Sequence, residues 1–323
     1  MSRDISLKNI DITTVYGPLP SWYLESYLGL DPLTPFKLCT FNCVYCPYEK
    51  VFYKEGGIGP DLIMRELDEY LSNDINFKYL LIEGRGDPIL NPYIRDIIKE
   101  SKRLLVERGG HNLLALRTCD PKIAMKRLGD RIKLLDLMIV KADAVSPRLV
   151  SSINGYPLPR DREEIVHILR KIKEYTNLAI KITLLRGCKS ELNFTPSELR
   201  SLVEFILDVS PNFVIITTPT WLKSNKFLPL NGEELREIAS LIVDFLSWEQ
   251  VLVYGLTDRR GEVCWKESDI TRILINSLLR RPLKYKEIER LGGKVALNVL
   301  SKLIRQGLVK AMSDDYYILE YNI

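Results

Sequence analysis

The sequence Cys39-Thr-Phe-Asn-Cys43-Val-Tyr-Cys46 places three cysteines within eight residues, in the spacing C-x3-C-x2-C. The chain of 323 residues has only six cysteines and two histidines, so half of its thiols lie in this one stretch. Composition alone produces such a triplet roughly once in a thousand sequences. Soft thiolate ligands suit iron–sulfur clusters, and three of them can bind three irons of a [4Fe–4S] cube. A structural zinc ion needs a fourth ligand, and residues 1–110 contain no other cysteine or histidine.

Length and composition limit the class of protein. With 323 residues, 46% of them hydrophobic, the chain can bury a core, which excludes disorder and suggests two domains or one barrel with an appendage. It has no apolar run of about 20 residues and no hydrophobic signal core at the start, so we expect a cytoplasmic protein that makes no membrane contact. The net charge of +4 is too small by itself to indicate nucleic-acid binding.

The cysteine stretch, with Tyr45 directly before its last cysteine, resembles the signature of the radical S-adenosylmethionine (SAM) superfamily. Upstream, Tyr16-Gly-Pro-Leu-Pro-Ser21 and Leu28-Gly-Leu-Asp31-Pro resemble the branch of that superfamily grouped with the wyosine-type tRNA base synthases. Trp22 and Tyr23 stand where that branch carries paired arginines. The resemblance implies that Tyr45 lies near the adenine of SAM, and that a [4Fe–4S] cluster is held by Cys39, Cys43 and Cys46.

Strand-like and helical patterns alternate along most of the chain. The strand segments are almost continuously apolar, which is typical of parallel strands buried on both faces. Strands and helices that alternate at these lengths predict βαβ units. About six such units favour an α/β fold with a partial (β/α)6 TIM-like barrel. The resemblance implies the same fold. The predicted strands are 78–83, 112–118, 135–141, 178–185, 212–217 and 250–254, and the predicted helices are 61–73, 93–108, 121–128, 161–175, 196–209 and 232–247.

The first predicted strand ends in Glu83-Gly-Arg-Gly-Asp-Pro88. In parallel α/β folds the chemistry lies at the carboxyl ends of strands, and glycines there let the backbone approach a ligand. The superfamily uses a Gly-Gly-Glu-Pro segment at this place to hold the amino group of SAM. We therefore predict cofactor contacts from Gly86, Asp87 and Pro88, with Arg85 replacing the first glycine of that segment and aspartate replacing its glutamate.

A second strand ends in Val140-Lys-Ala-Asp-Ala144. Lys141 and Asp143 are two residues apart, so on a strand they face the same side. A cation can bind the carboxylate of SAM and a carboxylate can bind its ribose hydroxyls. The branch carries a similar Lys-x-Asp-Ala, so these two residues form the second predicted cofactor site. An ion pair that caps the strand is the alternative interpretation.

Other polar residues follow the remaining strands. Arg117, Arg186 and the threonines of 217–220 are candidates for substrate contact. Cys119 and Cys188, both just past strand ends, could serve a second cluster or a substrate radical. Because free cysteine is among the most buried residue types, we predict instead that they and Cys264 are inert core thiols.

Residues 263–323 show a different pattern from the barrel domain predicted at 1–262. Three helices, at about 270–280, 282–291 and 295–306, precede a hairpin, and each break is marked by proline or glycine. This order resembles a winged helix-turn-helix domain. The whole charge excess lies here, since residues 265–323 contain eleven Lys/Arg and seven Asp/Glu. The third helix offers few side chains for reading bases, so RNA, a peptide or a protein is the favoured partner; those side chains are Lys294, Asn298, Lys302 and Arg305.

Two functions follow from these patterns. The resemblance implies a radical SAM enzyme that takes an electron from a ferredoxin or flavodoxin and cleaves SAM reductively to a 5′-deoxyadenosyl radical. That radical would modify an unidentified substrate, with tRNA or another macromolecule favoured because a small-molecule enzyme has little need of a winged helix. The alternative is an iron–sulfur redox sensor that binds DNA. Such a sensor would need no SAM site, so Gly86, Asp87, Lys141 and Asp143 argue against it.

Overall fold

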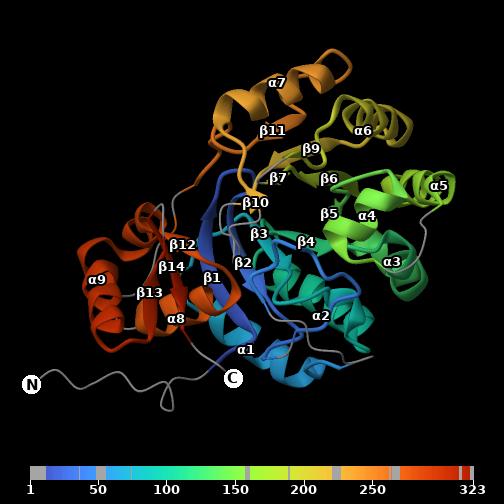
Figure 1. The fold of residues 1–323 in the computed structure, drawn as a ribbon. Helices are drawn as coiled ribbons and strands as arrows, with labels where there is room; N and C mark the ends of the chain where they lie inside the picture. Colours follow the sequence, from blue (N-terminus) through green and yellow to red (C-terminus); the bar gives the residue numbers. More distant parts are fainter. Residues whose placement is uncertain are drawn as a thin grey trace, which may run out of the picture.

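The computed structural model describes residues 12–35, 37–48, 56–73, 75–156, 161–187, 190–219, 227–261, 263, 270–312 and 315–320 (Figure 1). Its centre is a curled sheet that forms a partial barrel, with the strand order β1-β2-β3-β4-β5-β6-β9-β11. β1 runs antiparallel to β2, and every other neighbouring pair in this sheet is parallel. The strands are β1 (Val15–Ser21), β2 (Glu25–Leu30), β3 (Tyr79–Ile82), β4 (Leu113–Thr118), β5 (Leu137–Lys141), β6 (Asn177–Thr183), β9 (Phe213–Thr217) and β11 (Val251–Val253).

The sheet is wider than the six-stranded barrel predicted from the sequence. All six predicted strands are present, but the hairpin of β1 and β2 adds two more at one edge. β1 was not predicted because it contains Pro18 and Pro20, and proline lacks the N–H that a central strand must donate. An edge strand tolerates proline, and the register of β1 with β2 shifts between Tyr16 and Leu19, where Pro18 lies.

Helices cover the outer face of this sheet. A capping box begins α7: Asn231 Oδ1 accepts from Glu234 N at 3.0 Å, and Glu234 Oε2 accepts from Asn231 N at 2.8 Å. α4, which follows Ser146 and begins with Pro147, was not predicted. No helix in the described ranges combines the length and apolar character needed to cross a bilayer. The helices are α1 (Pro60–Leu71), α2 (Ile94–Glu107), α3 (Pro121–Leu128), α4 (Pro147–Asn154), α5 (Arg162–Lys173), α6 (Pro196–Val209) and α7 (Gly232–Val243), with 3-10 turns at Pro88–Leu90 and Gly129–Leu134.

The C-terminal region packs α8 (Ile270–Arg280) and α9 (Tyr285–Arg305) beside a three-stranded sheet of order β12-β14-β13. Non-helical backbone at Gly292 and Gly293 divides α9 into two helices, as the sequence predicted. The first of the two begins at residue 285 rather than 282 because Leu283–Lys284 forms β12, which pairs with β14. The other strands are β13 (Val309–Ala311) and β14 (Tyr316–Leu319); a separate small sheet contains β7 (Arg186–Gly187), β8 (Ser190–Glu191) and β10 (Phe227–Leu228).

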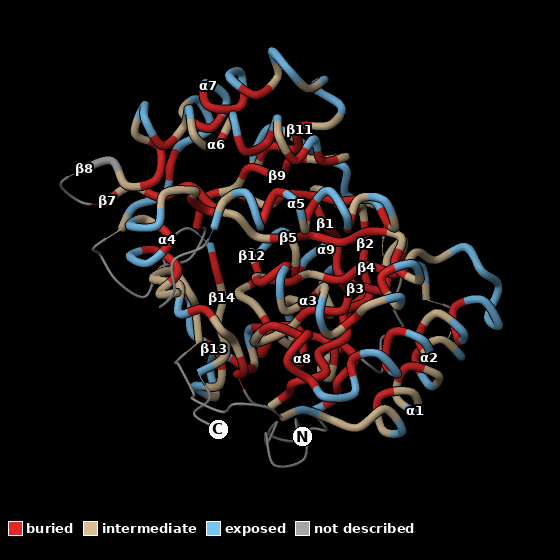
Figure 2. Tube along the Cα trace, turned by 90° about the vertical axis from the view of Figure 1, so that its right-hand side faces the viewer, coloured by how far each residue is buried: buried red, intermediate tan, exposed pale blue. Residues whose placement is uncertain are grey.

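The two faces of the main sheet have separate hydrophobic cores. On β3, Leu80 and Ile82 pack against the outer helices, whereas Leu81 belongs to a core shared with Leu274 and Leu278 of α8. Figure 2 shows the central strands as buried and much of the outer helix surface as exposed. Because both faces are covered, the strands read as continuous apolar runs rather than alternating ones. The C-terminal region therefore contributes to the hydrophobic core on the inner side of the open barrel.

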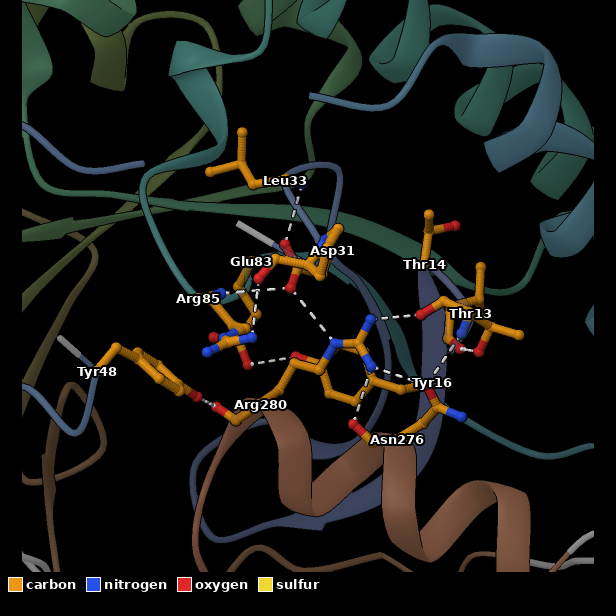
Figure 3. Close-up of polar contacts among 12 residues, drawn as sticks. Thr13, Thr14, Tyr16, Asp31, Leu33, Tyr48, Glu83, Arg85, Asn276 and Arg280 are labelled. Atoms are coloured by element: carbon orange, nitrogen blue, oxygen red, sulfur yellow. Dashed lines mark hydrogen bonds and ion pairs between the residues drawn. The ribbon is translucent and has the colours of Figure 1, made fainter. Parts of the chain in front are cut away.

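A buried ion pair joins this region to the barrel (Figure 3). Arg280, the last residue of α8, donates from Nε to Asp31 Oδ2 at 3.3 Å, and both side chains are almost completely buried. Arg280 also donates to Asn276 Oδ1 at 2.9 Å and to the carbonyl of Thr13. Its own carbonyl accepts from Tyr48 Oη, in the loop that carries the cysteines. Burial raises the pKa of Asp31, and the Arg280 charge opposes that rise.

Replacing Arg280 with methionine should lower the free energy of unfolding by about 3–5 kcal/mol, because Asp31 would be left as an uncompensated buried charge. Urea denaturation monitored by circular dichroism would measure the change. Arg108→Met is the matched control: it removes the exposed Arg108–Asp68 pair and should cost about 1 kcal/mol or less. Equal losses in the two variants would contradict a central role for the buried pair.

Candidate functional site

A cavity of about 310 Å³ opens at the carboxyl ends of the parallel strands. Its walls come from the loop after β2, which carries the three clustered cysteines, and from the ends of β3, β4, β5, β6 and β9. The turn between α8 and β12 closes one side. The lining includes Cys39, Cys43, Cys46, Gly84–Gly86, Arg117–Cys119, Lys141, Lys181, Thr183, Thr217–Pro219 and Arg280–Pro282.

The cysteine loop is braced against α4. Asn42 N donates to Asn154 O at 2.7 Å and Val44 N donates to Ile153 O at 2.9 Å. Within the loop, Cys46 N donates to Cys43 O at 2.9 Å. These backbone bonds turn the loop so that all three predicted cluster ligands face one cavity as free, half-buried thiols.

The donor set fits a cube better than a single ion. The described residues contain no group of three or more Cys, His, Asp or Glu that could hold one metal ion. In a [4Fe–4S] cluster each thiolate binds a different iron, so the ligands need only share a cavity. Burial raises the pKa of the Cys43 thiol, and Lys141, whose Nζ lies 2.8 Å from Cys43 Sγ, opposes that rise.

Lys141 lines the cavity, but Asp143 does not. The Asp143 carboxylate is buried and accepts from Tyr45 Oη, from Asn154 Nδ2 at 2.7 Å and from Thr183 N at 2.9 Å. Lys141 Nζ lies 3.3 Å from it. That Asp143 binds the ribose of SAM stays a prediction. Lys141 is the last residue of β5, so the two-residue alternation of a strand does not extend to Asp143. Asp143 contacts both Tyr45 and Lys141, and Lys141 Nζ lies 4.5 Å from the Tyr45 ring centroid.

Asp87 is likewise turned away from the cavity. Its buried carboxylate accepts from Thr118 Oγ1 at 2.9 Å, from Cys119 N at 2.8 Å and from Ile89 N at 3.4 Å. Pro88, also buried, begins a 3-10 turn and does not line the cavity. That Asp87 binds the amino group of SAM stays a prediction; within the protein its carboxylate accepts from residues at the end of β4. The side chain joins the end of β3 to the end of β4.

Gly84 and Gly86 are required by close packing. A Cβ on Gly86 would lie 1.8 Å from the carbonyl oxygen of Leu38, and one on Gly84 would lie 2.1 Å from the carboxylate of Asp31. Asp87 N donates to the same Leu38 carbonyl at 2.7 Å. Of the predicted Gly-Asp-Pro segment, Gly86 is the residue that reaches the cavity, and its backbone lies directly against the start of the cysteine loop.

Cys119 is not the inert core thiol that the sequence predicted. It lines the cavity with the three clustered cysteines, and a side-chain hydrogen bond with Cys39 is the main cause of its raised pKa. Cys188, a candidate for a second cluster, lies outside the described residues, as do Cys264 and Thr220. Arg186 pairs with Glu234 and does not line the cavity, whereas Arg117 and Thr217 do.

Sequence reasoning missed several cations of the cavity. Lys181 interrupts the apolar run of β6 at the same register as Lys141 on β5, a signal that could have been read. Arg281 lies 254 residues from Tyr27, to whose hydroxyl it donates at 3.2 Å, and no local pattern indicates that contact. Lys181 Nζ lies 5.3 Å from the ring centroid of Tyr23, which the sequence analysis did not connect with the cavity.

Comparisons with known proteins agree with this architecture. No protein-family model matches the chain. A UPF0026 protein of Methanocaldococcus jannaschii is 23% identical, and the match covers 97% of each chain. A radical SAM methyltransferase from Sphaerobacter thermophilus superposes with a TM-score of 0.50 at 12% identity, over 71% of this chain and 65% of that one. The structure described as native anSMEcpe with bound AdoMet and Cp18Cys peptide also gives 0.50, at 13% identity, over 76% and 65%. This chain thus spans about two thirds of each solved structure, and the likeness confirms the predicted partial barrel.

Gly86→Ala should destabilise the fold by about 1–3 kcal/mol, because the added methyl group collides with backbone rather than with a movable side chain. Thermal and urea unfolding would measure this. Gly232→Ala, at an open position in the first turn of α7, serves as the control and should change stability by less than about 1 kcal/mol. A Gly86→Ala variant as stable as the parent would show that the cysteine loop can move away.

The stability of the protein should also depend on the protonation of Asp87. Burial raises the pKa of Asp87 to about 6, so between pH 4 and 6 the folded state binds this proton more tightly than the unfolded state does. Stability relative to Asp87→Asn should therefore fall as pH rises through that window and level off above about pH 7. Urea titrations of both proteins at several pH values would measure the difference, and one that increased with pH would contradict the prediction.

Proposed function

We propose that this chain is a radical SAM enzyme that modifies a still unidentified substrate, with tRNA or another macromolecule favoured. The observation that carries the proposal is the meeting of Cys39, Cys43 and Cys46 with the Gly86 backbone and Lys141 in one cavity at the carboxyl ends of parallel strands. An iron–sulfur site that only sensed redox state would need no such cavity beside the cysteines. The fold shared with solved radical SAM proteins supports the same class.

The three clustered cysteines would hold a [4Fe–4S] cluster that leaves its fourth iron free for the amino and carboxylate groups of SAM. When bound, the cluster supplies the electron that splits SAM into methionine and a 5′-deoxyadenosyl radical. Lys141 stabilises the thiolate of Cys43 by its charge, at 2.8 Å. A ferredoxin or flavodoxin is the proposed electron donor, on the strength of the sequence resemblance.

The remaining residues of the site position SAM and keep water out. The backbone of Gly84–Gly86 offers carbonyl groups to the N–H groups of the SAM amino group, and Tyr45 provides an aromatic wall for its adenine. Lys141, which lies beside Cys43, offers its positive charge to the carboxylate of SAM. Asp87 and Asp143 act behind these groups as positioning residues, because neither carboxylate faces the cavity.

We further propose that residues 263–323 form a winged-helix domain that binds the substrate macromolecule or a partner. In the second helix of α9, Ala296, Leu300 and Leu303 are buried while Lys294 and Asn298 are exposed. Its polar side is therefore accessible to RNA, a peptide or a protein even though the domain packs on the barrel. The predicted boundary after residue 262 adjoins residues outside the described ranges.

Cys39→Ala, Cys43→Ala or Cys46→Ala should each abolish the cluster, because two thiolates leave a second iron of the cube without a protein ligand. Anaerobic reconstitution followed by iron and sulfide analysis and EPR of the reduced protein would measure this. Release of 5′-deoxyadenosine from SAM in the presence of a reductant should be lost in parallel.

Cys119→Ala is the matched control: this thiol lines the same cavity outside the C-x3-C-x2-C stretch, so its loss should leave the iron content unchanged. A complete cluster in the Cys43→Ala protein would refute the ligand assignment. If SAM does not change the EPR spectrum of the reduced parent protein and no 5′-deoxyadenosine is released, the redox-sensing regulator is favoured instead.

A further inference from the structure

Three cations converge on one wall of the cavity from three separate elements. Arg117 belongs to β4, Lys181 to β6 and Arg281 to the turn between α8 and β12. They surround Tyr23, which hydrogen-bonds with Arg117, lies 5.3 Å below Lys181 Nζ and is affected by the charge of Arg281. Arg117 and Lys181 lie on the inner side of the sheet, where the apolar Ala115 and Ala179 occupy the layer before them. The inner face thus changes from apolar to cationic toward the cavity.

The charge on this wall is only partly balanced. Arg117 pairs with Glu83 at 2.8 Å, and Arg281 pairs with Glu287 at 3.0 Å. Lys181 has no carboxylate within ion-pair distance among the described residues. Of the described residues that line the cavity, seven are lysine or arginine and none is aspartate or glutamate.

SAM does not use this excess. The cofactor carries a single carboxylate, and Lys141 stands beside the cysteines to receive it. A desolvated lysine without a partner is costly unless a ligand supplies the missing anion. Thr183 and Thr217, register partners on β6 and β9, also line the cavity and offer hydroxyl donors to such an anion.

We propose that Lys181, together with Arg117, Arg281 and the two threonines, binds an oxyanion of the substrate, a phosphate or a carboxylate. This inference rests on the proposed function, because it identifies the group as part of the substrate of that reaction. Arginine forks and threonine hydroxyls suit the several acceptor oxygens of such a group. Arg281 gives the C-terminal region a direct part in substrate recognition, since it reaches the cavity from outside the barrel.

The proposal predicts a link between anion binding and protonation. Burial, followed by the charge of Arg117, lowers the pKa of Lys181 to about 7. Lys141 lowers it further, whereas Glu83 and Asp143 raise it, and no other charged group is a leading influence. A bound anion favours the charged lysine, so anion affinity should fall as pH rises above about 7, and binding at pH 8 should take up a proton.

The test measures binding of inorganic phosphate and of acetate to the full chain without SAM, by thermal shift and calorimetry at constant ionic strength with chloride as the reference salt. Lys181→Met should weaken binding at least fivefold and remove its pH dependence, while its circular dichroism spectrum and SAM affinity stay those of the parent. Lys171→Met, which removes an exposed lysine on α5, is the matched control and should change neither the anion affinity nor its pH dependence. A response to phosphate alone identifies a phosphate group, and a response to acetate alone identifies a carboxylate.

Equal anion affinity in the Lys181→Met and parent proteins would overturn the proposal. So would anion binding that SAM displaces competitively, because the wall would then serve the carboxylate of the cofactor. Failure of the proposed function can be distinguished from failure of the anion site. A protein that forms no cluster and releases no 5′-deoxyadenosine can still be tested for anion binding. A Lys181→Met protein that unfolds is replaced by Lys181→Gln, judged by the same outcomes.

Discussion

The buried ion pair between Asp31 and Arg280 is the contact on which the site depends. Asp31 directly follows β2, accepts from the backbone N–H groups of Leu33 and Arg85, and accepts from Arg280 of α8. The backbone carbonyl of Arg280 in turn accepts from Tyr48 Oη in the cysteine loop. One charge pair therefore connects the cysteine loop, the glycine turn after β3 and the C-terminal region. Two desolvated charges stabilise little by themselves, but once buried they exclude other arrangements, because separating them leaves a charge without water.

The inner face of the barrel has two zones. Near the amino ends of the strands it is apolar, as at Leu81, and it shares one hydrophobic core with residues of α8 and α9. Near the carboxyl ends it carries Arg117, Lys141 and Lys181 around the cavity. The apolar zone keeps water away from the inner end of the cavity, which strengthens the electrostatic interactions of the charged groups at the carboxyl ends of the strands. The C-terminal region thus supports the site from within as well as closing one side of it.

Much of the fold could be predicted from the sequence because buried parallel strands are locally encoded as apolar runs between amphipathic helices. The hairpin of β1 and β2 was missed since its prolines are acceptable only at a sheet edge, and edge position is not visible in the sequence. The roles of Asp87 and Asp143 could not be decided from the sequence for a similar reason. A carboxylate at a strand end can face a ligand or hold two loops together, and only its neighbours in space distinguish the two.

The sequence by itself determined the three cysteines, their spacing and the alternating pattern of the barrel, because each depends on residues close together in the chain. Only the tertiary structure decided which side chains share the cavity. Cys119, Lys181 and Arg281 come from three distant segments, and the ion pair that seats the last of them links residues 249 positions apart. Such contacts depend on how sheet and helices pack, and packing is a property of the whole chain rather than of any stretch of it.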